Sequence, residues 1–242
     1  MRFLFKFARF STVTSHKKTS VLALVAALGA IGLTSCGPSY CPLPSHAIQA
    51  RGLKPGEGYV VGAFHMVSVD RTGNKYPSGA TTTVTARGAS NANKDSTVTF
   101  MPLPDNLKDL FSKNPNPDEL VAIPLPAGDY EITRWNITGP AVTATVTVSN
   151  RLPMKVPFQV RAGEATYVGR INVLTITGKN ILGMPVFGDG VVLITDEFEK
   201  DQPRIARKYT SIRASSIRRS EVPKLYKAEM KRIVGTPRPW WQ

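Results

Sequence analysis

The sequence predicts a mainly β protein: an antiparallel β-sandwich of about 8–10 strands, with a short helical insertion and a C-terminal helical tail. Short runs rich in β-branched residues recur with turn signals between them, and 19 Gly and 19 Pro interrupt the 242-residue chain. Helical periodicity dominates only after residue 196. With 42% hydrophobic and 20% charged residues, the composition is that of a folded globular chain and excludes wholesale disorder.

Residues 1–35 have the pattern of an export signal. Arg2, Lys6, Arg9, Lys17 and Lys18 come first without any acidic residue, and an apolar run over 21–33 and small residues follow. A helix over that run rises only about 20 Å, whereas a bilayer core is about 30 Å thick. The segment is therefore expected to be a cleaved signal peptide rather than a transmembrane helix.

The end of this signal resembles the lipobox of bacterial lipoproteins, because Leu33, Thr34 and Ser35 precede Cys36. The resemblance implies cleavage before Cys36, a diacylglycerol on its thiol and an acylated amino group. Two or three acyl chains anchor a protein firmly. Gly37 stands where an inner-membrane retention signal has Asp, which implies the outer membrane if the cell has one. The alternative is an ordinary secretory signal, in which case Cys36 and Cys41 could form a disulfide.

Residues 36–55 are expected to form a proline-rich, extended spacer, because Pro38, Pro42 and Pro44 disfavour helix. Residues 56–196 are expected to form the sandwich, with a short helix after Asp105. A tight hairpin turn is expected at 187–191, because Gly188 and Gly190 can adopt positive φ at little steric cost. The expected strands lie at residues 59–69, 80–87, 96–101, 120–125, 130–136, 142–149, 156–161, 166–177, 184–187 and 191–195.

Two passages, 125–132 and 158–169, resemble the "LPAGxY" and "FxVxAGxxxYVG" turns of β-sandwich domains in bacterial surface lipoproteins, similar to transthyretin-like or carboxypeptidase-regulatory modules. The resemblance implies a sandwich over residues 55–200 with a scaffolding or binding role. It also implies that Tyr130 crosses the corner after Gly128.

Residues 197–242 are expected to form a basic helical tail. Asp201 is a candidate cap for a first helix that has Ile205 and Tyr209 on one face. A second helix is expected from Ser220. Its apolar side is expected to consist of Val222, Leu225, Tyr226, Met230 and Ile233.

The positive charge of the exported chain is concentrated in this tail. The whole chain has a net charge of +14, of which the signal carries five basic residues. Residues 202–242 contain eleven basic and two acidic residues, and residues 36–201 are neutral overall. For an exported protein we therefore expect an anionic lipid, an envelope polymer or a protein as partner, and no nucleic acid. The candidate contact residues are Arg218, Arg219, Lys224, Lys227, Lys231, Arg232, Trp240 and Trp241.

Two alternatives remain for these residues. The charges are also typical of a solvated helical face, and the tryptophans suit either a membrane interface or a groove of the body.

No catalytic, metal or cofactor site is expected, so the chain is not predicted to be an enzyme. His16 lies in the signal, His46 in the spacer, and His65 stands alone in a strand. Zinc, phosphate-loop and dinucleotide motifs are absent from the sequence. The alternative function is an envelope hydrolase that uses carboxylate pairs such as Asp196/Glu197 or Glu199/Asp201.

Overall fold

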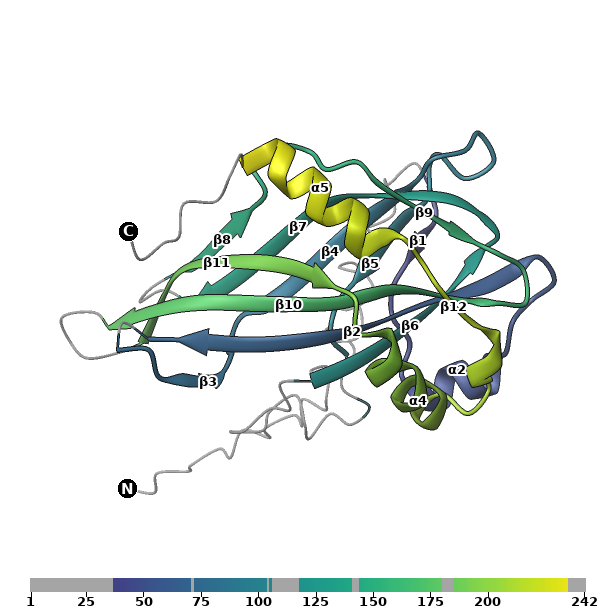
Figure 1. Cartoon of the computed structure of the whole chain (residues 1–242), viewed down its shortest axis with the longest axis horizontal. Helices are drawn as coiled ribbons and strands as arrows, with labels where there is room; N and C mark the ends of the chain where they lie inside the picture. Colours follow the sequence, from purple (N-terminus) through teal and green to yellow (C-terminus); the bar gives the residue numbers. More distant parts are fainter. Residues whose placement is uncertain are drawn as a thin grey trace, which may run out of the picture. The chain divides into compact units, whose positions relative to one another are not determined.

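The computed structural model describes residues 37–70, 72–103, 105, 118–140, 144–179 and 185–234 (Figure 1). The expected signal peptide, the lipobox and Cys36 lie outside the described residues, as do Trp240 and Trp241. The short helix expected after Asp105 also lies outside them.

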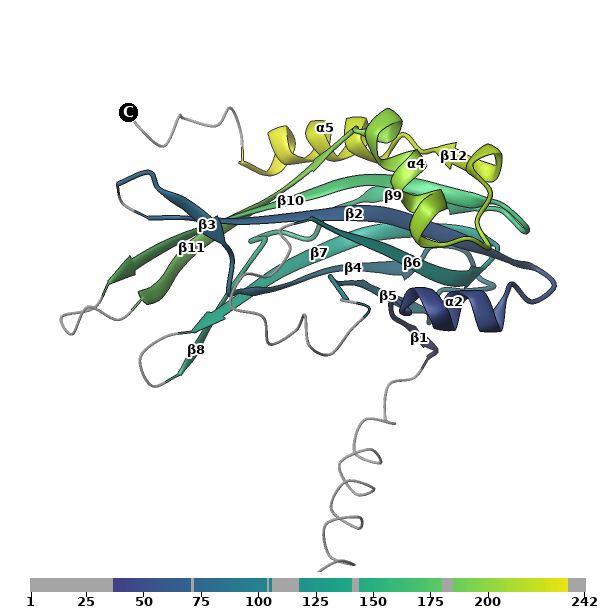
Figure 2. The same ribbon diagram turned by 90° about the horizontal axis from the view of Figure 1, so that it is seen from below.

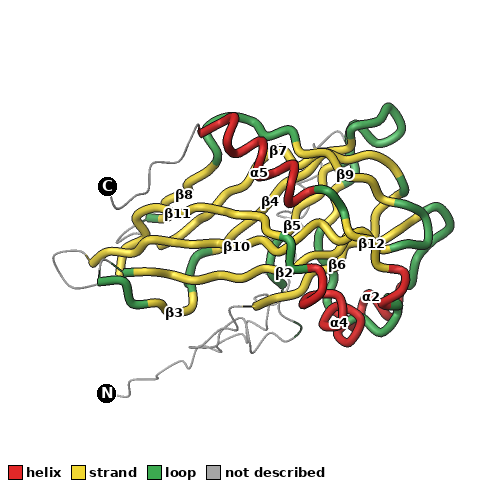
Figure 3. Tube along the Cα trace, viewed as in Figure 1, coloured by secondary structure: helices red, strands yellow, loops and turns green. Residues whose placement is uncertain are grey.

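The strands form two sheets that stack as a sandwich (Figures 1 and 2), so the predicted fold class is confirmed. The first sheet contains, in spatial order, β1 (Ser39–Tyr40), β5 (Thr97–Phe100), β4 (Thr81–Gly88) and β7 (Gly128–Pro140), followed by β8 (Thr145–Ser149) and β9 (Val156–Val160), which both pair with β7. The second sheet contains β11 (Pro185–Thr195), β10 (Ala165–Lys179), β2 (Glu57–Val69) and β3 (Lys75–Pro77), with β6 (Asp118–Pro126) paired to β2 and β12 (Ile217–Arg219) paired to β10. The helices of the described residues are α2 (Ser45–Arg51), α4 (Phe198–Lys208) and α5 (Val222–Val234), shown in red in Figure 3.

The sheets are mixed rather than purely antiparallel. Strand β2 runs parallel to β10, β1 runs parallel to β5, and β12 runs parallel to β10. The β2–β10 pair is the centre of the second sheet, and five strands of the first sheet, β4, β5, β7, β8 and β9, lie between these two strands in the chain. Such a long-range crossover leaves no local signal in the sequence, which explains why only antiparallel pairing was expected.

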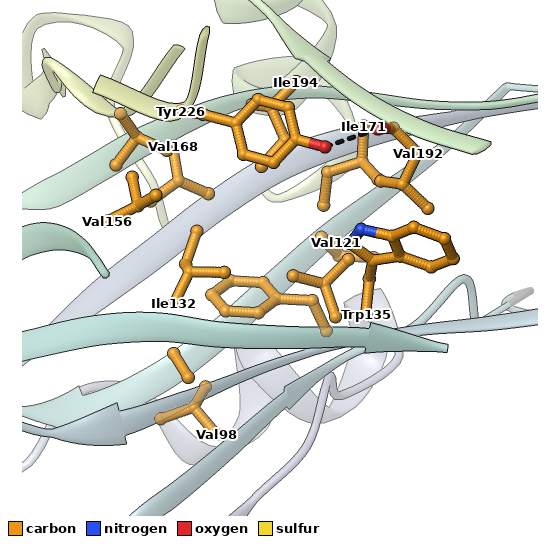
Figure 4. Close-up of a cluster of buried hydrophobic side chains, with 14 of the residues drawn as sticks. Val98, Val121, Ile132, Trp135, Val156, Val168, Ile171, Val192, Ile194 and Tyr226 are labelled. Carbon is orange, nitrogen blue, oxygen red and sulfur yellow. Dashed lines mark hydrogen bonds between the residues drawn. The ribbon is translucent and has the colours of Figure 1, made fainter. Parts of the chain in front are cut away.

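The core between the sheets follows the two-residue alternation of the strands. In β7, the inward-facing side chains are Tyr130, Ile132, Trp135 and Ile137. The spacing is three residues rather than two between Ile132 and Trp135, and a register shift against β4 at this point keeps all four on the same face. Figure 4 shows this core with Ile132 and Trp135 opposite side chains of the second sheet.

Strand β2 is buried on both faces, which explains its nearly continuous apolar sequence. Val60 and Phe64 belong to the core between the sheets. Val61 and Ala63 point to the outer face of the second sheet and belong to a separate cluster with Ile205 of α4.

The predicted tyrosine corner is present. The Tyr130 hydroxyl donates a hydrogen bond of 2.9 Å to the carbonyl oxygen of Pro126, and the ring stacks on Phe158 with a centroid distance of 5.6 Å. Glycine suits this corner because the backbone of Gly128 has a φ of 156°, which other residues rarely adopt, and a Cβ there would lie 2.9 Å from Nδ2 of Asn93.

The predicted hairpin turn at 187–191 is wrong. The segment lies inside the single strand β11, where Asp189 pairs with Ile176 and Phe187 pairs with Thr177. Gly188 is therefore the extra residue of a β-bulge. Gly190 permits close sheet packing, since a Cβ there would lie 2.7 Å from Cδ1 of Ile137 in the first sheet.

In its described part, the segment 36–55 packs onto the body and contains a helix, so the expected free, extended spacer is not found there. Strand β1 pairs with β5, and α2 begins directly after Pro44, whose conformation is extended. Ile48 of α2 is 1% exposed and joins the cluster on the outer face of the second sheet. Prolines before the first helical turn are compatible with a helix, which the prediction overlooked.

The C-terminal region is likewise part of the body rather than a tail. One compact unit begins at Gly37 and includes α4 and α5. On α4, Ile205 and Tyr209 are buried against the second sheet, as the expected one-face spacing requires. Helix α4 begins at Phe198, so Asp201 lies in its first turn and is not its cap.

Candidate functional site

Helix α5 closes the side of the sandwich between β9 and β11 (Figure 1). Val222 and Tyr226 are buried, and Met230 and Ile233 pack against the same core. The Tyr226 hydroxyl donates a hydrogen bond to the carbonyl oxygen of Val192, and burial raises the pKa of this phenol (Figure 4). Leu225 was predicted on this buried side but is 37% exposed. Successive residues of an α-helix are rotated by about 100°, so Leu225 points away from the direction of Tyr226.

The outward side of α5 carries three exposed lysines, Lys224, Lys227 and Lys231. Their i, i+3, i+7 spacing places them along one stripe of the helix. We call these three residues the lysine face. Lys224 lies 3.5 Å from Glu221, whereas Lys227 and Lys231 form no ion pair within the described residues.

The arginines of the predicted contact set are engaged with acidic side chains. Arg218 and Arg219 lie on β12, where Arg218 pairs with Glu164 at 3.3 Å. Arg219 pairs with Asp196 at 3.1 Å, and its guanidinium lies 5.2 Å from the Phe198 ring centroid.

Arg232 pairs with Glu229 at 2.6 Å, and its hydrogen bonds lower the pKa of that carboxyl group. The structure therefore brings together the three lysines of the predicted contact set. The charges of the three arginines in that set are partly neutralised by their acidic partners.

A charged cluster that the sequence did not predict lies where α4 meets the second sheet. Arg170 of β10 is 2% exposed and pairs with Asp201 of α4, which is fully buried. Asp201 also accepts hydrogen bonds from the Tyr167 hydroxyl at 2.7 Å and from Arg204 at 3.2 Å. Asp118 of β6 completes the cluster, 2.9 Å from Arg170.

His65 and Glu197 lie at the rim of this cluster. The Nδ1 atom of His65 lies 2.7 Å from Asp118, so the histidine that looked isolated in the sequence has a carboxylate partner. Glu197 lies 3.3 Å from Arg170. Glu197 and Asp201 thus help to compensate the charge of one buried arginine.

The cluster favours the charged forms of Asp118 and Arg170 and the neutral form of Tyr167. Burial opposes ionisation of Asp118, but the hydrogen bond from His65 and the charges of Arg170 and Arg204 outweigh it and hold the pKa of Asp118 below its usual value. For Arg170, burial is likewise outweighed by Asp201, so its pKa is raised. Burial and the bond to Asp201 raise the pKa of Tyr167.

This arrangement fastens α4 to the sheet, because Asp201 of α4 is paired with Arg170 of β10. The sequence held one signal for this cluster: Arg170 lies within an otherwise apolar strand. A charge in a buried strand requires a partner.

Acid is expected to destabilise the fold through Asp118. Its pKa is depressed in the folded state, so its stabilising contribution is present above the unfolded value near 3.9 and is lost as the pH falls through the folded value. Urea unfolding of wild type and Asp118→Asn between pH 7 and pH 3 measures this. We expect the variant to be less stable at pH 7 and to lose less stability on acidification. Equal losses in both proteins would contradict the role of Asp118.

The described residues contain no group of three or more side chains that could hold a metal ion, and none of their helices is long and apolar enough to cross a membrane. Cys41 is a free, exposed thiol, and His46 is exposed on α2. No protein-family model matches the chain, and no curated protein shows significant sequence similarity to it.

Proposed function

We propose that the chain is a lipid-anchored lipoprotein of the bacterial envelope whose β-sandwich body is a non-catalytic structural or binding module. The observation that carries this proposal is the junction at Cys36. A basic start, a short apolar run and small residues precede the cysteine, and the compact unit begins one residue after it, at Gly37. Removal of everything before Cys36 would therefore leave the folded unit whole.

The proposed location is the cell envelope, and the outer membrane in a cell that has one, because Gly37 rather than Asp follows the cysteine. The binding role is supported by the lysine face, which is exposed on a helix that packs against the core of the body. A non-catalytic role is supported by the carboxylates of Asp118 and Asp201, whose ion pairs with Arg170 hold them in place.

Replacing Cys36 by alanine tests the anchor, and Cys41→Ala is the matched control because it removes the other thiol. In cells fed a labelled fatty acid, we expect Cys36→Ala to lose the label and to leave the membrane fraction. The Cys41 variant is expected to keep both, since a bilayer holds two or three acyl chains firmly. A labelled Cys36→Ala protein would refute the proposed anchor.

A further inference from the structure

The described chain contacts the folded body from its first residue, Gly37. A Cβ at Gly37 would lie 1.9 Å from the carbonyl oxygen of Asp95, so this residue lies directly against the backbone of the body. The carbonyl oxygen of Pro38 accepts a hydrogen bond of 2.9 Å from the backbone N–H of Thr97. Ser39 then pairs with Thr97 in β5, and Tyr40 packs against the main core.

A lipid on Cys36 therefore holds the body close to the bilayer. One residue spans about 3.8 Å, so the edge of the first sheet at β1 stays at the membrane surface. The described residues after Cys36 form no free spacer that would let the body move away from the membrane, because Gly37 contacts Asp95 and residues 38–40 bond to β5.

The lysine face lies on the side of the body opposite β1. The order β1, β5, β4, β7, β9 crosses the first sheet, and α5 packs at the β9 edge. Four strand spacings of about 4.8 Å separate the two edges by about 19 Å. In Figure 2, β1 lies at the lower side and α5 along the upper side, with strands of both sheets between them. This separation exceeds twice the screening length of about 8 Å at physiological salt.

The chemistry of the face favours a polyanion over a folded protein. Three lysines dominate it, and the neighbouring apolar side chain is Leu225, 37% exposed. Lysine is depleted in protein interfaces, where buried aromatic and arginine side chains dominate. Lysine instead provides mobile point charges, and from Lys224 to Lys231 these extend about 10 Å along the helix.

We propose that the lysine face of α5 binds an anionic cell-wall polymer on the side of the body that faces away from the anchoring bilayer. The choice of a cell-wall polymer instead of the bilayer rests on the proposed lipid anchor at Cys36. The residues that bind are Lys224, Lys227 and Lys231, and the partner is recognised by repeated negative charges rather than by shape.

Co-sedimentation of the detergent-solubilised mature lipoprotein with purified insoluble peptidoglycan tests the binding. The triple variant Lys224→Gln, Lys227→Gln, Lys231→Gln is expected to bind at least about tenfold more weakly than wild type at low salt. The matched control removes three exposed lysines elsewhere, at Lys54, Lys75 and Lys94, and is expected to change binding less than about twofold. Equal weakening in both variants, or none in either, would overturn the proposal.

A second arm distinguishes the polymer from the membrane. The lipoprotein is reconstituted in vesicles with either zwitterionic lipid alone or about one third anionic lipid, and its lysines are labelled with an amine reagent. We expect equal labelling of Lys227 and Lys231 in both vesicles. Protection in the anionic vesicles would mean that α5 contacts headgroups and would overturn the proposal. Loss of the protein from flotation would instead refute the lipid anchor, while the peptidoglycan assay still reports on α5.

Discussion

Replacing Arg170 by methionine is expected to lower the free energy of unfolding by about 3–5 kcal/mol. The arginine is 2% exposed, and its removal leaves Asp201 fully buried with a weaker set of partners. Urea denaturation of the mature body measures the change. A loss under about 1 kcal/mol would contradict a role for the charged cluster in holding α4.

Two further variants isolate the cause. Arg219→Met removes an exposed ion pair and is expected to cost less than about 1 kcal/mol. Adding Asp201→Leu to Arg170→Met removes both buried charges and is expected to restore part of the lost stability, because the uncompensated carboxylate is then absent. A double variant that is less stable than Arg170→Met would mean that Asp201 stabilises α4 independently of Arg170.

Replacing Tyr226 by alanine is the second substitution with a large expected effect, a loss of about 3–5 kcal/mol. The ring is 2% exposed and fills the space between β9 and β11, so its removal opens a cavity beside Val192. Tyr226→Phe keeps the ring and is expected to cost about 0.5–1.5 kcal/mol, the contribution of a hydrogen bond. Thermal or urea unfolding measures both.

Leu225→Ala is the matched control for α5, because it shortens the adjacent side chain. Its expected effect is within about 0.5 kcal/mol, since the side chain is 37% exposed. If Leu225→Ala and Tyr226→Ala cost the same, the described rotation of α5 is wrong. A small effect of both would restore the reading of the C-terminal region as a solvated tail.

The local features of the fold were predictable from the sequence, and the long-range ones were not. The alternation of β7 and the corner at Gly128 and Tyr130 depend on residues within one turn or one strand, so the sequence carries them. The parallel pairing of β2 with β10 joins segments about a hundred residues apart and has no local signature.

The same distinction explains what was missed at the sites. Arg170, Asp118 and Asp201 come from a strand, another strand and a helix, and only the packed structure brings them together. The glycine pair at 188 and 190 suggested a turn because glycine serves both turns and bulges, and pairing across β10 decides between them. For α5, periodicity predicted the helix and its buried tyrosine but placed Leu225 on the wrong side by one position.

Intact mass spectrometry of the mature protein, isolated from its host membrane, tests the central claim most directly. The account predicts that the first residue is Cys36 and that it carries a diacylglycerol, with an additional acyl chain where the amino group is modified. A soluble product that retains Met1, or one that begins elsewhere with an unmodified Cys36, would contradict it.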